Sequence, residues 1–392
     1  MPAIFQRMDL DGQFDEVEQE FVTQLRRVVD REIAPRAETI DRDASFPWDN
    51  VRALNELGIN GVFIPREYGG TPTSYRCILR LVEELSRGCA ATANTWTNTY
   101  LTAHAITSFG TSEQMARILP RINTGGLAAV AFAESAGVAD DVSSSTTLTP
   151  HPKGGWLLRG EKRFITNGDV AEVIVAFANI PEPVGDRKHL TAVILERDTP
   201  GLVIGPAETK LGYRASSTVS LFFDDCALTT ADILGVEGAG YPILRRIHAK
   251  SRPCLSAQAI GIAGAAFDEA VRSTNDRQIF GQRVLDFQGV QFMFADMISK
   301  LALARSWMLY VGRLIDEYPA ENHELEGSIL KIAASDAAMS ITTDAVQVNG
   351  GAGYMAGATV ERLYRDAKLT QMLEDANEWD RARIGSSFLN AP

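Results

Sequence analysis

"GWLLRGEKRFITNG", residues 155–168, is typical of a β-strand that ends at an Asn-Gly turn. Five further runs between about residues 126 and 235 are also short and either apolar or alternating. Gly, Pro, Asn and Asp separate the runs, as in turns between strands. Several such runs at this spacing predict an antiparallel β-sandwich or β-barrel. The five runs are "LAAVAFAES" (127–135), "AEVIVAFANI" (171–180), "LTAVILERD" (190–198), "LVIGPAETK" (202–210) and "TVSLFFDDCAL" (218–228).

Helical periodicity dominates on both sides of this region. Before it, apolar residues recur every three or four positions, which is the pattern of an amphipathic helix. After it, two stripes of the same kind predict long helices joined by short connectors, as in a helical bundle. We therefore expect an α+β chain with an N-terminal helical domain (1–125), a middle β-domain (126–235) and a C-terminal helical bundle (236–392). The stripes are Phe14, Val17, Phe21, Leu25 and Val28; Leu255, Ala259, Ile262, Ala266 and Ala270; and Phe294, Met297, Leu301, Ala304, Met308 and Val311.

Composition limits the partners of the chain. Its 392 residues carry a net charge of −12, and the pI is about 5.0. Such a chain is a poor match for nucleic acid or for an anionic membrane surface, so we expect neither partner. No apolar run approaches the ~20 residues that cross a bilayer. The N-terminal stretch lacks the basic and apolar regions of a signal peptide, and we therefore expect a cytoplasmic protein.

Cysteine and histidine are placed without the spacing of metal ligands. The four cysteines form no C-x-x-C pair, and the five histidines form no H-E-x-x-H motif. We expect free thiols in a reducing compartment and no metal site. The cysteines are Cys77, Cys89, Cys226 and Cys254.

The end of strand 155–168 is a first candidate ligand contact. Thr166 could present its hydroxyl and backbone to a planar ligand there. The same residues suit a plain hairpin with an Asn-Gly corner, and the pattern by itself favours the hairpin. The loop "AESAGVADDVSS" (133–144) could line the mouth of a ligand site or be an ordinary surface loop.

A second candidate contact is "NDRQIFGQRVLDFQGVQF" (275–292), where Arg277 and Gln288 flank a Phe280-Gly281 break. An arginine beside a glycine suits a pyrophosphate, because the guanidinium pairs with phosphate oxygens and glycine permits close approach. A surface arginine at a helix end explains the pattern equally well.

The glycines of "QVNGGAGY" (347–354) are a third candidate contact. Gly350, Gly351 and Gly353 could admit a phosphate or a ribose. The segment before them looks helical, so the stretch is not a dinucleotide fingerprint, and a helix–helix turn also explains it.

Two adjacent acids, Glu374 and Asp375, lie in "LTQMLEDANEWDRARI" (369–384). Most such acids are solvated residues at a helix start. The alternative is that one acid is held in a dry site, where it can move a proton.

Taken together and in order, these stretches resemble the acyl-CoA dehydrogenase family. The resemblance covers nearly the whole chain and implies an N-terminal helical domain, a middle β-domain and a C-terminal four-helix bundle. It also implies FAD as cofactor and a homo-oligomer, a tetramer or a dimer. The matching motifs are "IPREYGG" (64–70), "KRFITNG" (162–168), "KLGYRASST" (210–218), "LGVEGAGY" (234–241), "SRP" (251–253), "DRQIFG" (276–281), "QVNGGAGY" (347–354) and "YRDAKLTQMLE" (364–374).

The resemblance also implies roles for individual residues. Glu374 falls where these enzymes carry their catalytic base, and Ser251 occupies the family's other base position without offering a carboxylate. Asp140 and Arg252 are the implied substrate contacts. The implied FAD contacts are Phe132, Phe164 and Thr166 in the β-domain, and Arg277, Phe280, Gln288, Gln347, Gly350 and Gly351, of which several would reach the FAD of a neighbouring subunit.

Departures from the family pattern concern the flavin loop and the base. Ala133 replaces the usual loop threonine, and Ala139 stands where the usual loop serine is expected. Asp375 replaces the glycine that commonly follows the base. If Asp375 faced inward, a second carboxylate would raise one pKa of the pair. We favour the alternative in which Asp375 faces outward as a helix cap.

The function that follows is dehydrogenation of an acyl thioester at its α and β carbons. Glu374 would remove the α-proton and FAD would accept the β-hydride. The substrate would be carried by coenzyme A or by an acyl-carrier protein, and an electron-transfer flavoprotein or, as second choice, dioxygen would reoxidise the flavin. The alternatives are a flavin-dependent monooxygenase or oxidase on the same fold, and a non-catalytic acyl-thioester-binding protein.

Overall fold

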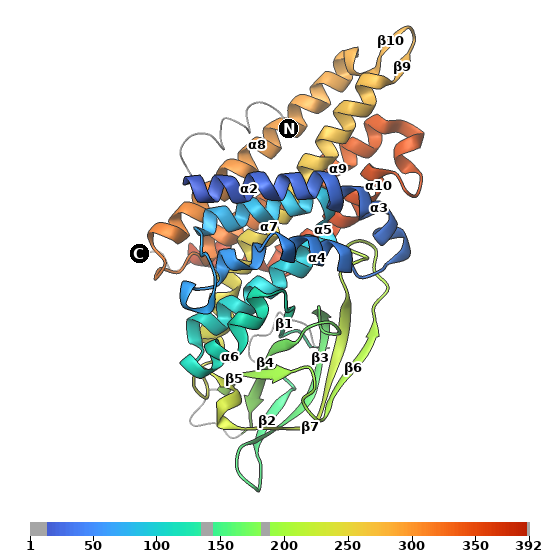
Figure 1. Cartoon of the computed structure of the whole chain (residues 1–392). Coiled ribbons are helices and arrows are strands. Elements are labelled where there is room, and N and C mark those ends of the chain that lie inside the picture. The colour runs from blue at the N-terminus through green and yellow to red at the C-terminus, as the bar shows by residue number, and fades with distance from the viewer. Residues whose placement is uncertain (1–13, 135–143, 182–188, 390–392) are drawn as a thin grey trace.

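The computed structural model describes residues 14–134, 144–181 and 189–389 (Figure 1). Helices come first, strands follow and helices return, so the predicted α+β architecture is confirmed. The first helices are α2 (Glu16–Val28), α3 (Ala34–Asp43), α4 (Trp48–Glu56), α5 (Tyr75–Phe109) and α6 (Ser112–Asn123). The later helices are α7 (Gly240–Asp276), α8 (Gln288–Glu317), α9 (Glu324–Asn349), α10 (Thr359–Thr370) and α11 (Asn377–Ser387).

One twisted sheet makes up the β-domain. Along the sheet the strand order is β6-β7-β3-β2-β4-β5-β8, with β1 paired to β4. Most neighbours are antiparallel as predicted, but β1 and β2 run parallel to β4. The strands are β1 (Ala128–Ala131), β2 (Thr147–Pro150), β3 (Trp156–Thr166), β4 (Val173–Ile180), β5 (His189–Glu196), β6 (Leu202–Ala207), β7 (Thr218–Leu228) and β8 (Ile233–Leu234).

Strand β4 joins two cores because successive side chains of a strand point to opposite faces. Val173, Val175 and Phe177 belong to the core that continues into the helices. Ile174 and Ala176 belong to a second core inside the β-domain. The sheet is therefore packed against the helical part of the molecule on one face, which fixes the position of the strand ends relative to α5 and α7.

Helices α5 and α7 cross at close range in the centre of the molecule (Figure 1). A Cβ atom built on Gly261 of α7 would lie 2.3 Å from the backbone oxygen of Glu83, so only glycine fits at this crossing. Helix α5 is also interrupted at Cys89, whose φ of −157° and ψ of 105° are extended. Because α7 also carries Ser251 and Arg252, this crossing fixes the helix on which the site described below lies.

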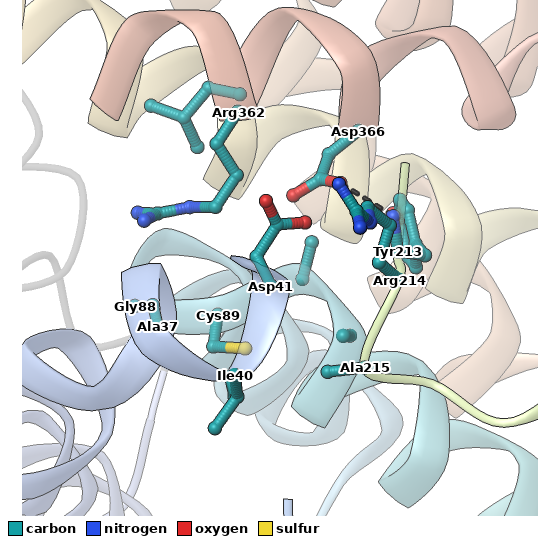
Figure 2. A pocket seen from close by; sticks show the side chains of 13 residues that line it. Ala37, Ile40, Asp41, Gly88, Cys89, Tyr213, Arg214, Ala215, Arg362 and Asp366 are labelled. Carbon is teal, nitrogen blue, oxygen red and sulfur yellow. Dashed lines mark hydrogen bonds between the residues drawn. The ribbon is translucent and has the colours of Figure 1, made fainter. Parts of the chain in front are cut away.

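The three parts of the chain meet around Asp41 of α3, the turn at Tyr213 and Asp366 of α10 (Figure 2). Arg365 binds Asp41 at 2.6 Å, and the Tyr213 N–H donates to Asp366 at 2.6 Å. Burial raises the pKa of Asp366 to about 6, against this hydrogen bond. The junction ties α10, and with it the loop that follows, to both other parts of the chain.

A short antiparallel hairpin, β9 (Gln278–Ile279) and β10 (Gln282–Arg283), connects α7 to α8. It lies at the end of the helical bundle that is remote from the β-domain (Figure 1).

Candidate active site

Glu374 and Asp375 lie in the loop between α10 and α11, not at a helix start. Both have positive φ angles, 64° for Glu374 and 117° for Asp375. Non-glycine residues rarely adopt such angles, and each costs ~1–3 kcal/mol unless surrounding contacts hold it. The interpretation of the pair as a solvated helix start is therefore wrong, and the contacts of the two side chains explain why.

The Glu374 side chain is partly buried against α7. The Ser251 hydroxyl donates a hydrogen bond to Glu374 Oε2 at 2.6 Å. Burial raises the pKa of the Glu374 carboxyl, and the charge of Asp375 adds to the rise. The Ser251 hydrogen bond and the charges of Arg252 and Lys331 act in the opposite direction without cancelling it. A carboxyl group with this balance is suited to accept a proton near neutral pH.

Asp375 faces inward, so the favoured outward orientation is wrong. Its Oδ2 accepts from Arg252 Nη2 at 2.8 Å and lies 3.4 Å from Nη2 of Arg383. The side chains of Arg252 and Asp375 are only 1% and 8% exposed. A guanidinium this deeply buried needs a carboxylate, and that requirement draws Asp375 inward against its backbone preference.

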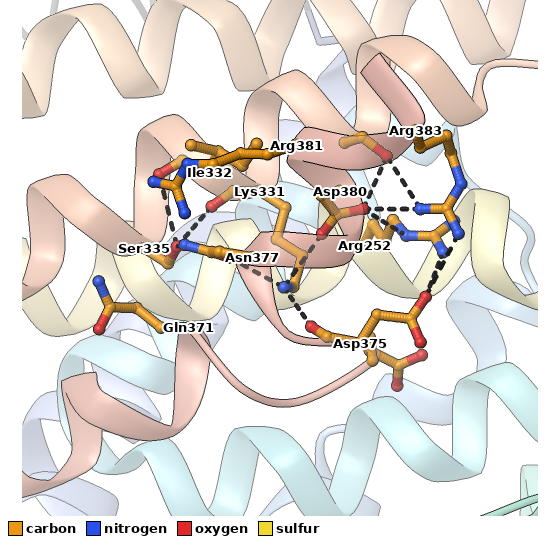
Figure 3. A network of polar contacts seen from close by, with 12 residues as sticks. Arg252, Lys331, Ile332, Ser335, Gln371, Asp375, Asn377, Asp380, Arg381 and Arg383 are labelled. Atoms are coloured by element: carbon orange, nitrogen blue, oxygen red, sulfur yellow. Dashed lines mark hydrogen bonds and ion pairs between the residues drawn. The ribbon is translucent and has the colours of Figure 1, made fainter. Parts of the chain in front are cut away.

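Asp380 of α11 extends the pair into a network (Figure 3). Its carboxylate lies 3.3 Å from Arg252 Nε, 3.1 Å from Lys331 Nζ and 2.8 Å from Arg383 Nη1. Lys331 of α9 also donates to the backbone oxygen of Asp375 at 2.6 Å. Side chains from α7, α9 and α11 thus hold the loop of Glu374 in place.

The two predicted substrate contacts have different outcomes. Asp140 lies outside the described residues. Arg252 has its guanidinium against Asp375 and Asp380, and its Nη1 is buried without a hydrogen-bond partner in the described part of the chain. A role of Arg252 in binding substrate stays a prediction.

The predicted flavin contacts of the β-domain lie beside α5 and α7. Phe132 follows β1, and its ring packs edge-on against His248, three residues before Ser251. Phe164 of β3 has a φ of 57° and is 63% exposed, while Thr166 at the end of β3 is buried. The side chain of Asn167 donates to the backbone of the first β-strand and of α5, at Ala128 and Thr95.

The favoured hairpin at residues 162–168 is wrong. Strand β3 pairs with β2 and β7, whereas β4 pairs with β5, β1 and β2. Asn167 does adopt the left-handed conformation, with a φ of 63°. Its buried amide makes long-range bonds, however, and these turn the chain toward the helices instead of back along β3.

Lys162 and Glu134 form a buried ion pair at 2.6 Å where β1 ends. Glu134 also accepts hydrogen bonds from Ser144, Ser145 and Thr146. Burial alone would raise the pKa of Glu134, but the hydrogen bonds from Lys162 and the serines lower it to about 2. This cluster joins the two ends of the loop in which Ala139 and Asp140 occur.

The remaining predicted cofactor residues gather at the far end of the helical bundle. Arg277 ends α7, and its Nη1 donates to the backbone oxygen of Asn349 at 3.2 Å. Gly350 has a φ of 63°, and a Cβ atom there would lie 2.8 Å from Arg277 Nη1. Phe280 at the hairpin tip is 94% exposed. The exposed residues Gln288, Gln347 and Gly351 complete the group.

Comparison with known proteins places this geometry in one family. Three domain models match the chain in order: "Acyl-CoA dehydrogenase, N-terminal domain" at residues 15–126, "middle domain" at 129–226 and "C-terminal domain" at 238–389. The chain belongs to the acyl-CoA dehydrogenase family. The relatives of this chain in the family are oxidoreductases that act on CH–CH bonds.

Relatives of the chain match over nearly its full length. It is 38% identical to a cyclohex-1-ene-1-carbonyl-CoA dehydrogenase of Geobacter metallireducens over 367 residues, which are 93% of this chain and 96% of the relative. It is 36% identical to an acryloyl-CoA reductase (NADH) of Anaerotignum propionicum over 375 residues, 95% and 94% of the two chains.

Solved structures of family members superpose closely. Butyryl-CoA dehydrogenase from Megasphaera elsdenii matches with a TM-score of 0.91 and 33% identity over 96% of this chain and 99% of that one. An acyl-CoA dehydrogenase from Bacillus anthracis, complexed with FAD, gives 0.89 and 28% over 96% and 68%. The prolyl acyl carrier protein oxidase AnaB gives 0.90 and 25% over 96% and 100%.

For this acyl-CoA dehydrogenase family member, the sequence patterns do not identify most of the residues that hold the loop of Glu374. Ser251 was noted only for lacking a carboxylate, although it is the hydrogen-bond donor to Glu374. Lys331, Asp380 and Arg383 carry no motif. The one signal is the position of Ser251, directly before Arg252 in the motif "SRP" (251–253).

Among the described residues, no helix has the length and the apolar composition that a membrane crossing requires. No cluster of His, Cys, Asp and Glu side chains in the described ranges could hold a metal ion. The four cysteines are buried and free of disulfide bonds.

Proposed function

We propose that this family member catalyses the FAD-dependent α,β-dehydrogenation of an acyl thioester, with Glu374 as the base. The observation that carries the proposal is the state of Glu374: partly buried, tethered by Ser251 and raised in pKa. The α-C–H bond next to a thioester is weakly acidic, so its removal needs a base whose pKa lies near the working pH. Among the described acids with a raised pKa, Glu374 occupies the family's base position.

Glu374 removes the α-proton with the oxygen that Ser251 does not use. The Ser251 hydroxyl occupies Oε2, which fixes the carboxylate plane and leaves Oε1 for the substrate. Arg252 acts as a positioning residue. Its ion pairs with Asp375 and Asp380 hold the loop between α10 and α11, and the loop orients Glu374 toward the substrate. Small errors in this placement are expected to slow proton transfer strongly.

The β-domain residues fit a flavin. Phe164 offers an exposed ring, and Asn167 Oδ1 beside Thr166 is buried without a hydrogen-bond partner among the described residues. The Phe132 ring packs edge-on against His248 of α7, and its centroid lies 5.9 Å from Nζ of Lys162 of β3. Bound FAD supplies the acceptor for the β-hydride of the substrate. We assign Phe132, Phe164 and Thr166 to the FAD of the same chain.

The second group of residues supports a homo-oligomer, a tetramer or a dimer. Arg277, Phe280 and Gly350 lie at the end of the bundle that is remote from the β-domain (Figure 1). One chain therefore does not bring both groups to one cofactor. We assign this group, together with Gln288, Gln347 and Gly351, to the FAD of a neighbouring copy. An electron-transfer flavoprotein is the proposed electron acceptor.

Anaerobic flavin bleaching tests the proposal. The purified protein is mixed with a panel of acyl-CoA and acyl-carrier-protein thioesters, and loss of the yellow absorbance is followed. Wild type is expected to bleach with at least one thioester, and Glu374→Gln is expected to bind FAD without bleaching. Glu378→Gln, an exposed glutamate nearby, is the matched control.

Other outcomes would select the alternatives. Bleaching of Glu374→Gln at the wild-type rate would remove Glu374 from the reaction. Rapid oxygen uptake by the reduced protein with an oxygenated product would indicate a monooxygenase. A colourless protein that takes up no added FAD would indicate a non-catalytic thioester-binding protein.

A further inference from the structure

A cavity of about 240 Å³ lies beside Lys250 of α7, the residue directly before Ser251. Its walls come from the segment at Val62 and Phe63, from α5, from Lys250 of α7 and from the C-terminal end of α8. Most of the lining is apolar or aromatic, which is typical of a small-molecule site with few polar contacts. Lys250 and His104 supply polar groups that the proposed reaction does not use.

Lys250 is buried in this wall without a carboxylate partner. The residue as a whole is 8% exposed, and Nζ lies 3.9 Å from the centroid of the Tyr75 ring. No ion pair is formed by Lys250 within the described residues. Burial lowers the pKa of Lys250 to about 8, which leaves the ammonium mostly charged at neutral pH. A cation–π contact compensates only part of the cost of removing an ammonium from water.

His104 of α5 is a second polar group without a partner. Its Nε2 atom is buried and has no hydrogen-bond partner in the described part of the chain. Burial lowers the pKa of His104 to about 3, so the imidazole is neutral and can still donate one N–H. His104 and Lys250 both line the cavity.

Asp316 also lines the cavity, but both of its carboxylate oxygens already accept hydrogen bonds from other groups. The backbone N–H of Tyr75 donates to Oδ1 at 2.6 Å. The backbone N–H and Nε of Arg76 donate to Oδ2 at 3.2 and 3.1 Å. Asp316 thus caps α5 and pairs with Arg76. Its charge also raises the pKa of Lys250, but the two side chains form no ion pair within the described residues.

We propose that Lys250 and His104 bind a carboxylate at the far end of the acyl group, so that the substrate class is an ω-carboxyacyl thioester. This rests on the proposed function, because it assumes that the thioester end lies at Glu374. Lys250 directly precedes Ser251, the hydrogen-bond donor to Glu374. The Tyr75 hydroxyl lies 3.5 Å from Sγ of Cys254, one turn further along α7. The cavity therefore borders the same turn of α7 as the hydrogen-bond donor to Glu374, and the proposal places the acyl chain between them.

Two measurements on the FAD-loaded protein separate this inference from the proposed function. Calorimetric titration of the oxidised protein gives the Kd for ω-carboxyacyl-CoA thioesters and for methyl-terminated acyl-CoA thioesters of equal length. Bleaching rates with the same compounds report on the reaction. We expect tighter binding of the ω-carboxy compound, and Lys250→Met should weaken that binding at least ~30-fold while changing the methyl-terminated compound little.

The controls decide between a binding role and a structural one. Lys250→Arg should retain most of the preference, His104→Phe should reduce it, and Lys153→Met, at an exposed turn, should leave it unchanged. Equal Kd values for the two series in wild type would overturn the inference, as would an equal loss for both series in Lys250→Met. If Lys250→Met does not fold, His104→Phe and the wild-type preference give the answer. Preferential binding without bleaching would count against the proposed function alone.

Discussion

Replacing Asp375 separates two effects that this residue combines: a strained backbone and a buried ion pair. Asp375 has a φ of 117°, which costs a non-glycine residue ~1–3 kcal/mol. Its partner Arg252 is 1% exposed, and removing one member of a buried pair costs ~3–5 kcal/mol. Because Asp380 still lies 3.3 Å from Arg252 Nε, we expect the lower end, about 3 kcal/mol, for Asp375→Asn.

Asp375→Gly loses the same ion pair but also relieves the strain. Its net destabilisation should therefore be smaller, about 1 kcal/mol, and the order of stability should be wild type, Asp375→Gly, Asp375→Asn. Thermal unfolding monitored by calorimetry ranks the three proteins. Asp49→Asn, which breaks the exposed pair with Arg52, is the matched control and should cost less than about 1 kcal/mol.

The same two variants should also change the pKa of Glu374, the proposed base. The charge of Asp375 raises the pKa of Glu374, whereas Arg252 lowers it. Removing Asp375 therefore lowers the pKa of Glu374 twice, directly and by freeing the charge of Arg252. The acidic limb of the bleaching rate should move to lower pH in both variants. An Asp375→Asn protein as stable as wild type, or a Glu374 titration that moves to higher pH, would refute this reasoning.

Three other substitutions have definite expected results. Glu374→Gln should slow anaerobic bleaching roughly 10²–10⁴-fold while FAD absorbance is retained, since it removes only the proton acceptor. Ser251→Ala removes a hydrogen bond that lowers the pKa of Glu374, so the acidic limb of the bleaching rate should move to higher pH, and movement to lower pH would contradict the assignment. Glu134→Gln leaves Lys162, which is 0% exposed, without its carboxylate and should cost ~3–5 kcal/mol in thermal unfolding. The pKa of Glu134 is about 2 in the folded protein and about 4.5 ordinarily, so the ionised carboxylate stabilises the fold fully above pH 4.5. This stabilisation is lost as the pH falls from 4.5 toward 2. Glu134→Gln should therefore lack this part of the acid dependence of stability.

The sequence was sufficient for the architecture because each element carries its own periodicity. The apolar periodicity that begins at Phe14 and the continuous apolar run of β4 are local properties, and they form a helix and a strand as predicted. Val17 of the predicted stripe is, however, 52% exposed. The corner at Asn167 was misread for the opposite reason. Its Asn-Gly pattern is local, but its partners are Thr95 and Ala128, 72 and 39 residues away. A local pattern predicts a turn and does not determine which strand follows it.

The loop between α10 and α11 shows even more clearly that a local pattern does not determine long-range contacts. Ser251 bonds Glu374 and Arg252 bonds Asp375, each across 123 residues. The position of Asp375 directly after Glu374 does not reveal whether its side chain faces outward as a helix cap or inward as the partner of Arg252. The choice depends on the burial of the guanidinium, which only the packing of α7 against α9 and α11 creates.

Charge balance explains why an aspartate is compatible with the position where the family commonly has glycine. The site places Glu374, Asp375 and Asp380 among Arg252 and Lys331, with Arg383 at the edge. With glycine at 375, the cations would face one fewer carboxylate, and their field would favour the ionised form of Glu374. Asp375 takes up the nearest of these charges, so burial dominates the pKa of Glu374 and raises it. The strained backbone at Asp375 therefore accompanies a raised pKa of Glu374, the proposed base, beside Arg252.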